Sequence, residues 1–296
     1  MARINSITIG KGKGSLGNVT LRYVGGDTIA SQKVLKKGSG GTLKQVSIRA
    51  RWGNIVNLFQ TFEGALEKCF QEVRRPRQSD FNMFLSRNIK KSGVYLTADQ
   101  VRQGGAVAFG AQISEGSLPS IAHGLATGDV ITSDIVMGSL SITASTTLKA
   151  FSNAIISNNV GWQVGDQLSA FALLQSVNSE TQVPYVTCQK IEITLDTSDA
   201  AEDVMVRDLA GPAYLSIVDG KIAFGSTING AGCYVHSRIE NGITLVSTQT
   251  LVESNSILSN FTSAAQMLVA VESYHGTRQE AFITPNIDDI VAPVTP

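Results

Sequence analysis

The chain has 296 residues, of which 43% are hydrophobic and 16% charged. This composition excludes a fibrous or broadly disordered protein, and the length suffices for a hydrophobic core without metal or disulfide support. The net charge is zero, but residues 1–91 hold 17 Lys and Arg against 5 Asp and Glu (17 − 5 = +12), and residues 92–296 hold 7 against 19 (7 − 19 = −12). A basic segment of this kind can dock on nucleic acid, on an acidic protein, or on the acidic part of another copy.

Residues 1–41 are rich in Gly, Lys and Ser. They predict a basic extended arm, with short strands near residues 3–9 and 19–24, that becomes ordered on a partner. Residues 12–17 spell Gly-x-Gly-x-x-Gly. A dinucleotide site needs a helix that begins at the last glycine. Because the strand-like residues 18–21 follow instead, we interpret this motif as a flexible turn or a loop that contacts a neighbour through its backbone.

Residues 42–104 predict a helical hairpin region. Thr42 and Gln45 fit a capping box, and Pro76 ends the pattern. Between them, apolar residues recur in alternating steps of four and three: Ile48, Trp52, Ile55, Phe59, Phe62, Leu66, Cys69 and Val73. This stripe predicts one long amphipathic helix that packs either within its own chain or between copies in an oligomer.

Two shorter helices are expected after it. One begins at Ser79 and stops before Gly93, and the other begins at the Thr97–Gln100 capping box. Basic residues cluster around the predicted helix ends, where the macrodipole favours cations. They form a candidate basic contact patch of Arg74, Arg75, Arg77, Arg87, Lys90 and Lys91. Interleaved aromatic residues, typical of nucleic-acid readers, are not evident, so direct binding of nucleic acid is the weaker interpretation.

Residues 105–284 predict a β-rich, sandwich-like region, either one sandwich or two. Residues 191–196 alternate as a half-buried strand does. Asp219-Gly220 and Asn241-Gly242 each join two strand-like runs, which predicts hairpins with tight turns. Helical interruptions are expected near residues 146–157 and 262–268, and residues 285–296 are expected to be extended. The fold class predicted for the whole chain is therefore α+β.

No pattern indicates catalysis, a cofactor or a metal. His123, His236 and His275 lack the spacing of metal ligands. The cysteines are far apart and odd in number, which predicts free thiols, and Cys188 and Cys233 lie in strand-like runs as small apolar residues. Neither a signal peptide nor a membrane span is expected. These features favour a non-enzyme that is made and kept in a cytoplasm, or assembled from one, without contact to a membrane.

The first ninety residues resemble an uncharacterised family found in Bacteroidota genomes and their phages. The similarity rests on residues 2–6 (Ala-Arg-Ile-Asn-Ser), 17–19 (Gly-Asn-Val), 48–51 with Phe59, and 80–84 with Asn88. A Val-Gly-Asp turn like residues 164–166 is similar to one in the second half of that family.

The resemblance implies a virion component of crAss-like phages, such as a ring, tail-barrel or capsid-associated protein, with no catalytic residues. The leading hypothesis is therefore a structural subunit of the virion, made in the host bacterial cytoplasm, that forms a ring-like homo-oligomer and contacts other virion proteins. Packaged DNA is a further candidate contact. The alternative is a nucleic-acid-associated protein that uses the basic N-terminal third. A hydrolase or carbohydrate-binding β-domain is a third, minor hypothesis.

Overall fold

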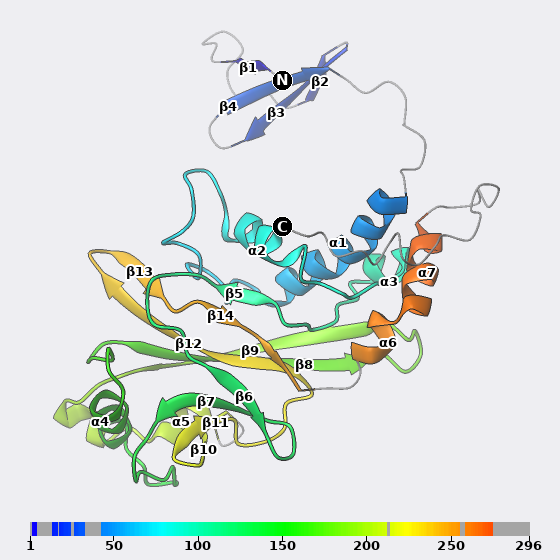
Figure 1. The fold of residues 1–296 in the computed structure, drawn as a ribbon. Helices are drawn as coiled ribbons and strands as arrows, with labels where there is room; N and C mark the ends of the chain where they lie inside the picture. The colour runs from blue at the N-terminus through cyan, green and yellow to red at the C-terminus, as the bar shows by residue number, and fades with distance from the viewer. Residues whose placement is uncertain are drawn as a thin grey trace. The chain divides into compact units, whose positions relative to one another are not determined.

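The chain divides into two compact units, residues 1–42 and residues 43–296. The computed structural model describes residues 2–4, 14–16, 18–24, 27–32, 43–211, 214–254 and 258–274 (Figure 1). Helices and several antiparallel sheets are both present, so the predicted α+β class with a β-rich region is confirmed. Three expectations lie outside the described residues: the cap at Thr42, the role of His275, and the extended segment 285–296.

The first unit contains a four-stranded antiparallel sheet in the order β1-β4-β3-β2. Its strands are β1 (Ala2–Ile4), β2 (Gly14–Leu16), β3 (Val19–Val24) and β4 (Asp27–Gln32). The short strands expected near residues 3–9 and 19–24 correspond to β1 and β3, and the ordering of this segment on a partner stays a prediction. Val24 pairs with Asp27, so the Gly-Gly dipeptide between them was an overlooked hairpin signal. The glycine-rich motif leads into strand β3, as expected, and not into a helix.

Five helices form one layer of the second unit, and local caps explain where several of them begin. Ser79 Oγ accepts a hydrogen bond from the Asn82 amide, and the capping box of Thr97 and Gln100 is complete, so both predicted starts are confirmed. A Cβ on Gly53 would lie 2.5 Å from a methyl group of Val101, so only glycine allows this approach between two helices. The helices are α1 (Leu43–Thr61), α2 (Asp80–Asn88), α3 (Ala98–Arg102), α6 (Leu258–Thr262) and α7 (Ala264–Ser273).

The first helix is shorter than the apolar stripe predicted. It ends at Thr61, and residues 62–73 form consecutive turns, in which Glu63 and Lys68 have positive φ angles. The prediction of a helix to Val73 is therefore wrong. These turns are closed by hydrogen bonds between residues three positions apart, such as Cys69 N to Leu66 O. They bring apolar residues to the core at intervals similar to those of a helix, which is why the sequence pattern looked helical.

The stripe itself is buried only in part. Ile48 and Trp52 are 45% and 43% exposed. The first half of α1 buries a different set, Val46 and Ala50. From the middle of α1 onward the prediction agrees with the structure, since Ile55, Phe62, Leu66 and Cys69 are buried and Phe59 and Val73 are partly buried.

The central layer is an antiparallel sheet in the order β13-β12-β8-β9, with a short strand β15 (Val252–Glu253) also paired to β12. Its main strands are β8 (Gln167–Val177), β9 (Pro184–Thr194), β12 (Gly230–Glu240) and β13 (Ile243–Val246). Phe171, Cys233 and Val235 share one core with the helical layer. In that core Phe59 packs on Phe81 with ring centroids 5.1 Å apart, which joins α1 to α2.

A second antiparallel sheet, in the order β10-β11-β7-β6, shares a separate core with the other face of the central sheet. Leu168 and Tyr234 of the central sheet contribute to this core, together with Ile131 and Phe224. The second unit therefore has three layers: helices, central sheet and second sheet (Figure 1). The remaining elements here are β6 (His123–Ala126), β7 (Val130–Val136), α4 (Leu148–Asn158), η1 (Asp199–Glu202), α5 (Val206–Ala210), β10 (Ser216–Val218) and β11 (Lys221–Ala223).

Both predicted hairpins are confirmed. Asp219 and Gly220 have φ angles of 51° and 73°, and Asn241 and Gly242 have 50° and 76°. Both turns place two consecutive residues in the left-handed region, which Asn, Asp and Gly tolerate. The expected helical interruptions correspond to α4 and to α6 with α7.

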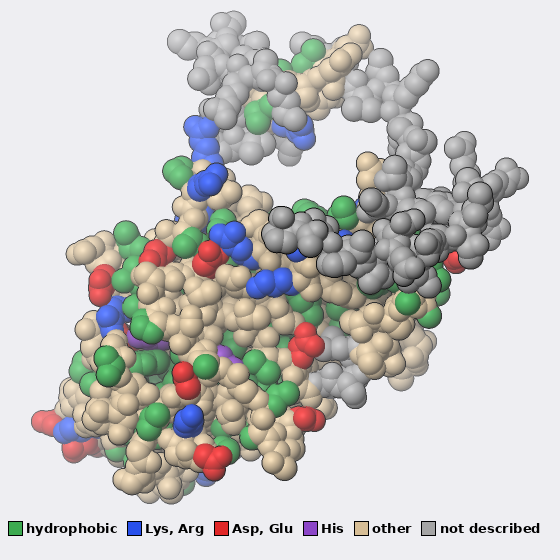
Figure 2. Space-filling view, in the orientation of Figure 1, with side chains coloured by type: hydrophobic (Ala, Val, Ile, Leu, Met, Phe, Trp, Pro, Cys, Tyr) green, Lys and Arg blue, Asp and Glu red, His purple; other side chains and the backbone are tan. Residues whose placement is uncertain are grey.

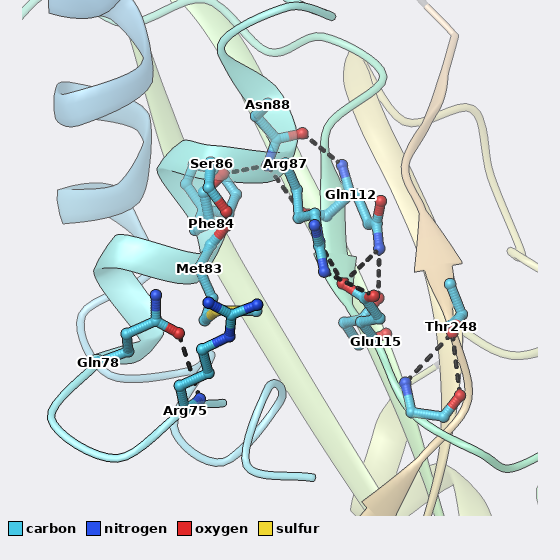
Figure 3. Close-up of polar contacts among 12 residues, drawn as sticks. Arg75, Gln78, Met83, Phe84, Ser86, Arg87, Asn88, Gln112, Glu115 and Thr248 are labelled. Atoms are coloured by element: carbon cyan, nitrogen blue, oxygen red, sulfur yellow. Dashed lines mark hydrogen bonds and ion pairs between the residues drawn. The ribbon is translucent and has the colours of Figure 1, made fainter. Parts of the chain in front are cut away.

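Buried amide side chains hold an extended segment, residues 105–114, between the helices and the central sheet. Asn54 of α1 exchanges two hydrogen bonds with the backbone of Val107, at 2.7 and 3.0 Å. Asn88 of α2 does the same with Gln112, which belongs to strand β5 (Gln112–Ser114) paired with β14 (Gln249–Thr250) (Figure 3). These amides satisfy backbone groups that would otherwise be buried without partners.

Candidate interaction surface

One end of the second unit combines exposed apolar side chains with a basic loop. At the tip of the β12–β13 hairpin, Ile239 is 75% exposed and Ile243 is 46% exposed. The turn segment 62–78 lies beside this hairpin: Gln71 Oε1 accepts a hydrogen bond from Thr244 N at 3.3 Å. We call the hairpin tip and this segment together the hairpin surface. Exposed apolar groups of this size on a soluble domain are typical of a contact region.

A buried ion cluster fixes the base of the hairpin. Asp166, fully buried, accepts hydrogen bonds from Arg238 Nε at 2.6 Å and Nη2 at 2.7 Å, and it lies 2.8 Å from His236 Nε2. Trp162 stacks on the His236 ring, with centroids 3.8 Å apart. Burial alone would raise the pKa of Asp166, but the hydrogen bonds from Arg238 and His236 outweigh burial and lower it to about 2. The carboxylate is therefore charged at neutral pH and holds β12 against the loop before β8.

A cleft of about 420 Å³ lies over the polar end of the central sheet. Its floor includes Ser169 and Glu192, which are paired across β8 and β9, and its wall includes Glu67 and Lys68. Lys190 forms an ion pair with Glu192 at 2.5 Å and lies 5.3 Å above the ring of Phe171. The charges of the cleft are thus largely balanced among themselves.

A second groove, of about 430 Å³, lies between the loop and the β13 strand. Arg74, Arg75 and Arg77 line one side, and Ile243 and Leu245 line the other. We call this the basic groove. All three arginines are exposed. Arg77 also has a φ angle of 70°, a conformation that costs free energy for a residue with a side chain and is often found at functional sites.

The structure separates the predicted basic contact patch into two groups. Arg74, Arg75 and Arg77 follow a run of turns and not a helix end, so the macrodipole explanation for them is wrong. Arg74 pairs only distantly with Asp80, at 3.6 Å.

The other three cations belong to α2 and the turn that follows it. Arg87 forms two hydrogen bonds with Glu115, at 2.5 and 2.9 Å (Figure 3). Lys91 donates to Gln112 at 3.2 Å. Lys90 is exposed. In Figure 2, Lys and Arg side chains of this unit gather mainly over α2 and the loop before it. Arg87 and Lys91 thus serve to attach α2 to β5, and the loop arginines remain directed toward the basic groove.

The sequence analysis did not identify the apolar part of this surface. Ile239 and Ile243 flank the Asn-Gly turn, and there the alternating pattern resembles that of any half-buried strand. A useful signal was the presence of two isoleucines within two residues of the Asn-Gly turn, because solvent-exposed positions at the tip of a hairpin are usually polar.

The histidines and cysteines play structural roles in the described part of the chain. Burial raises the pKa of Cys69 and Cys188 to about 12 and also raises that of Cys233, so these thiols are unreactive near neutral pH. His123 Nε2 accepts a hydrogen bond from Tyr234 N at 2.8 Å. Within the described residues, no three potential metal ligands come together.

Comparisons with family models, with curated proteins and with solved structures found no match to this chain. The resemblance to a phage family therefore stays a prediction. Within the ranges that the structure describes, no helix has the length and apolar character needed to span a membrane.

Proposed function

We propose that this protein is a structural subunit of a tailed bacteriophage virion that forms a multi-copy ring or shell, in a tail, neck or capsid-associated position. The observation that carries this proposal is the division into two compact units of opposite charge. Residues 1–42 hold seven Lys and Arg and a single acid, Asp27 (7 − 1 = +6), so the remainder of this neutral chain carries −6. Opposite charges on two units of one chain suit head-to-tail contacts, which close into rings when the rotation between copies allows it.

The hairpin surface supports the same proposal. On the face of the hairpin that carries Ile243 and Leu245, apolar side chains lie beside the loop arginines. Apolar side chains with a charged margin are the usual composition of a protein–protein contact. Individual surface ion pairs contribute only about 0–1 kcal/mol each, so assembly must depend on many pairs together with apolar burial.

Sedimentation and negative-stain imaging of the purified chain test this function. We expect large closed assemblies at low salt that weaken as salt rises, since exposed charges are screened over about 8–10 Å near physiological ionic strength. Reversing Arg74, Arg75 and Arg77 to Glu tests the hairpin surface separately from the charge of the whole unit, and it should reduce assembly because it removes the cations that border this surface. Three other exposed cations provide a matched control for reversal: Arg102, Arg207 and Lys221. A chain that stays monomeric at every concentration and salt would refute the proposal.

A nucleic-acid-associated role is the second candidate, and one observation favours it. On strand β3 of the basic first unit, Arg22 and Tyr23 are both exposed and lie on opposite faces of the strand. An exposed aromatic ring on a basic unit can stack on a base while cations of the unit bind phosphates. Binding of single-stranded DNA that weakens steeply with salt, and that is lost on Tyr23→Ala, would support this role over self-assembly.

A further inference from the structure

The basic groove has the chemistry of a receptor for an acidic, apolar peptide. Three arginines on one side can bind carboxylates through charge-assisted hydrogen bonds. Ile243 and Leu245 on the other side provide apolar contacts for neighbouring side chains. A segment that fits must therefore carry acids directly beside branched apolar residues.

The chain contains one segment with this composition that is not part of the described fold. Residues 286–291 read Asn-Ile-Asp-Asp-Ile-Val, so two adjacent acids lie between isoleucines. The only other adjacent acids in the sequence are Glu202 and Asp203, and Glu202 already pairs with Lys149 at 2.7 Å. We infer that the basic groove binds residues 286–291 of a neighbouring copy, an inference that rests on the proposed multi-copy assembly.

Distance favours a neighbouring copy over the same chain. Helix α7, which precedes this segment, packs at Val46 near the start of α1, whereas the groove follows the other end of α1. The 19 residues of α1 span about 28 Å. Residues 275–286 reach at most about 40 Å when fully extended. A segment from the same chain would have to use most of that reach to pass along α1 and then cross to the groove, which costs conformational entropy that a neighbouring copy need not lose.

Cross-linking between two full-length variants tests this inference. One variant carries Ile243→Cys, at an exposed position of the groove, and the other carries Ile290→Cys, each with a different affinity tag. After mixing and treatment with a short bismaleimide, we expect a cross-linked dimer that contains both tags. The matched control replaces Ile243→Cys by Leu125→Cys, which is 50% exposed on β6 in the second sheet. The parent chain controls for its own largely buried thiols.

A charge exchange strengthens the test. Arg75→Glu with Arg77→Glu in the groove variant should reduce the mixed dimer to the level of the control. Adding Asp288→Lys and Asp289→Lys to the partner variant should restore it. A mixed dimer no more abundant than in the control, or a cross-link found only within a chain carrying both cysteines, would overturn the inference. If the parent chain still sediments as a large assembly in that case, the proposed function survives and only this contact is refuted.

Discussion

Lowering the pH below neutrality should destabilise the second unit through a single buried histidine. On the outer edge of β12, Ala231 and Gly232 pair with β15, and residues 237–240 pair with β13. Between these stretches, the amide of Tyr234 donates to His123 Nε2. The imidazole therefore takes the place of the backbone acceptor that a neighbouring strand would provide for Tyr234. It must be neutral, because a protonated Nε2 cannot accept a hydrogen bond.

The magnitude follows from the two protonation states. Burial lowers the pKa of His123 to about 4, although the charge of Asp134 acts in the opposite direction. The unfolded chain binds the proton near pH 6.5, so the stabilisation is complete above that pH and is lost as the pH falls toward 4. The loss amounts to about 2 kcal/mol at pH 5 and about 3 kcal/mol at pH 4.

Urea unfolding followed by tryptophan fluorescence can measure this loss, since Trp162 stacks in the core of the same unit. The matched variant is His123→Gln, whose side-chain oxygen can accept from Tyr234 without titrating. We expect the parent to lose about 2 kcal/mol more than this variant between pH 7.5 and 5. Parallel pH profiles for the two proteins would refute the reasoning.

Two further predictions concern the core. Phe62→Ala removes a ring that is 2% exposed and should cost about 3–5 kcal/mol in unfolding free energy, measured by urea titration; an unchanged midpoint would contradict its place in the core. Arg238→Met leaves the buried charge of Asp166 without its main partner and should cost about 3 kcal/mol, whereas adding Asp166→Asn should recover part of that loss. If the double variant is no more stable than Arg238→Met alone, the ion pair does not fix the hairpin base.

Local signals in the sequence predicted local structure well. The caps at Ser79 and Thr97 and the Asn-Gly and Asp-Gly turns depend on hydrogen bonds and φ angles within a few residues, and the structure contains all four. The α+β class followed from the change in apolar period near residue 105. These features need no information about distant parts of the chain.

The long helix could not be predicted correctly, because its apolar period does not distinguish a helix from successive turns. Residues 62–73 bury Phe62, Leu66 and Cys69 through turns that lie on the central sheet. Only the partner surface decides between the two backbones. The same limit applies to Ile48 and Trp52, whose exposure depends on how α1 is rotated against α7.

The sequence does not predict the amide contacts along residues 105–114 either. Asn54 and Asn88 read as ordinary polar residues on amphipathic helices, and only the fold shows that each one forms two hydrogen bonds with the backbone of a single residue in this segment. Their pairing partners lie 53 and 24 residues away. Contacts at such separations require the tertiary arrangement to be known first.

The hairpin surface owes its shape to rigid elements beneath it. On one face of β12, Arg238 donates two hydrogen bonds to the carboxylate of Asp166. Ile239, the next residue, points to the opposite face of the strand and is exposed. The alternation of a strand thus couples a buried ion pair to an exposed apolar side chain. Because the base is already fixed, a partner that packs on either face of the hairpin tip, at Ile239 or at Ile243, would immobilise little additional backbone. More of the contact energy would then remain as affinity. A contact surface of this kind suits repeated assembly from many identical copies.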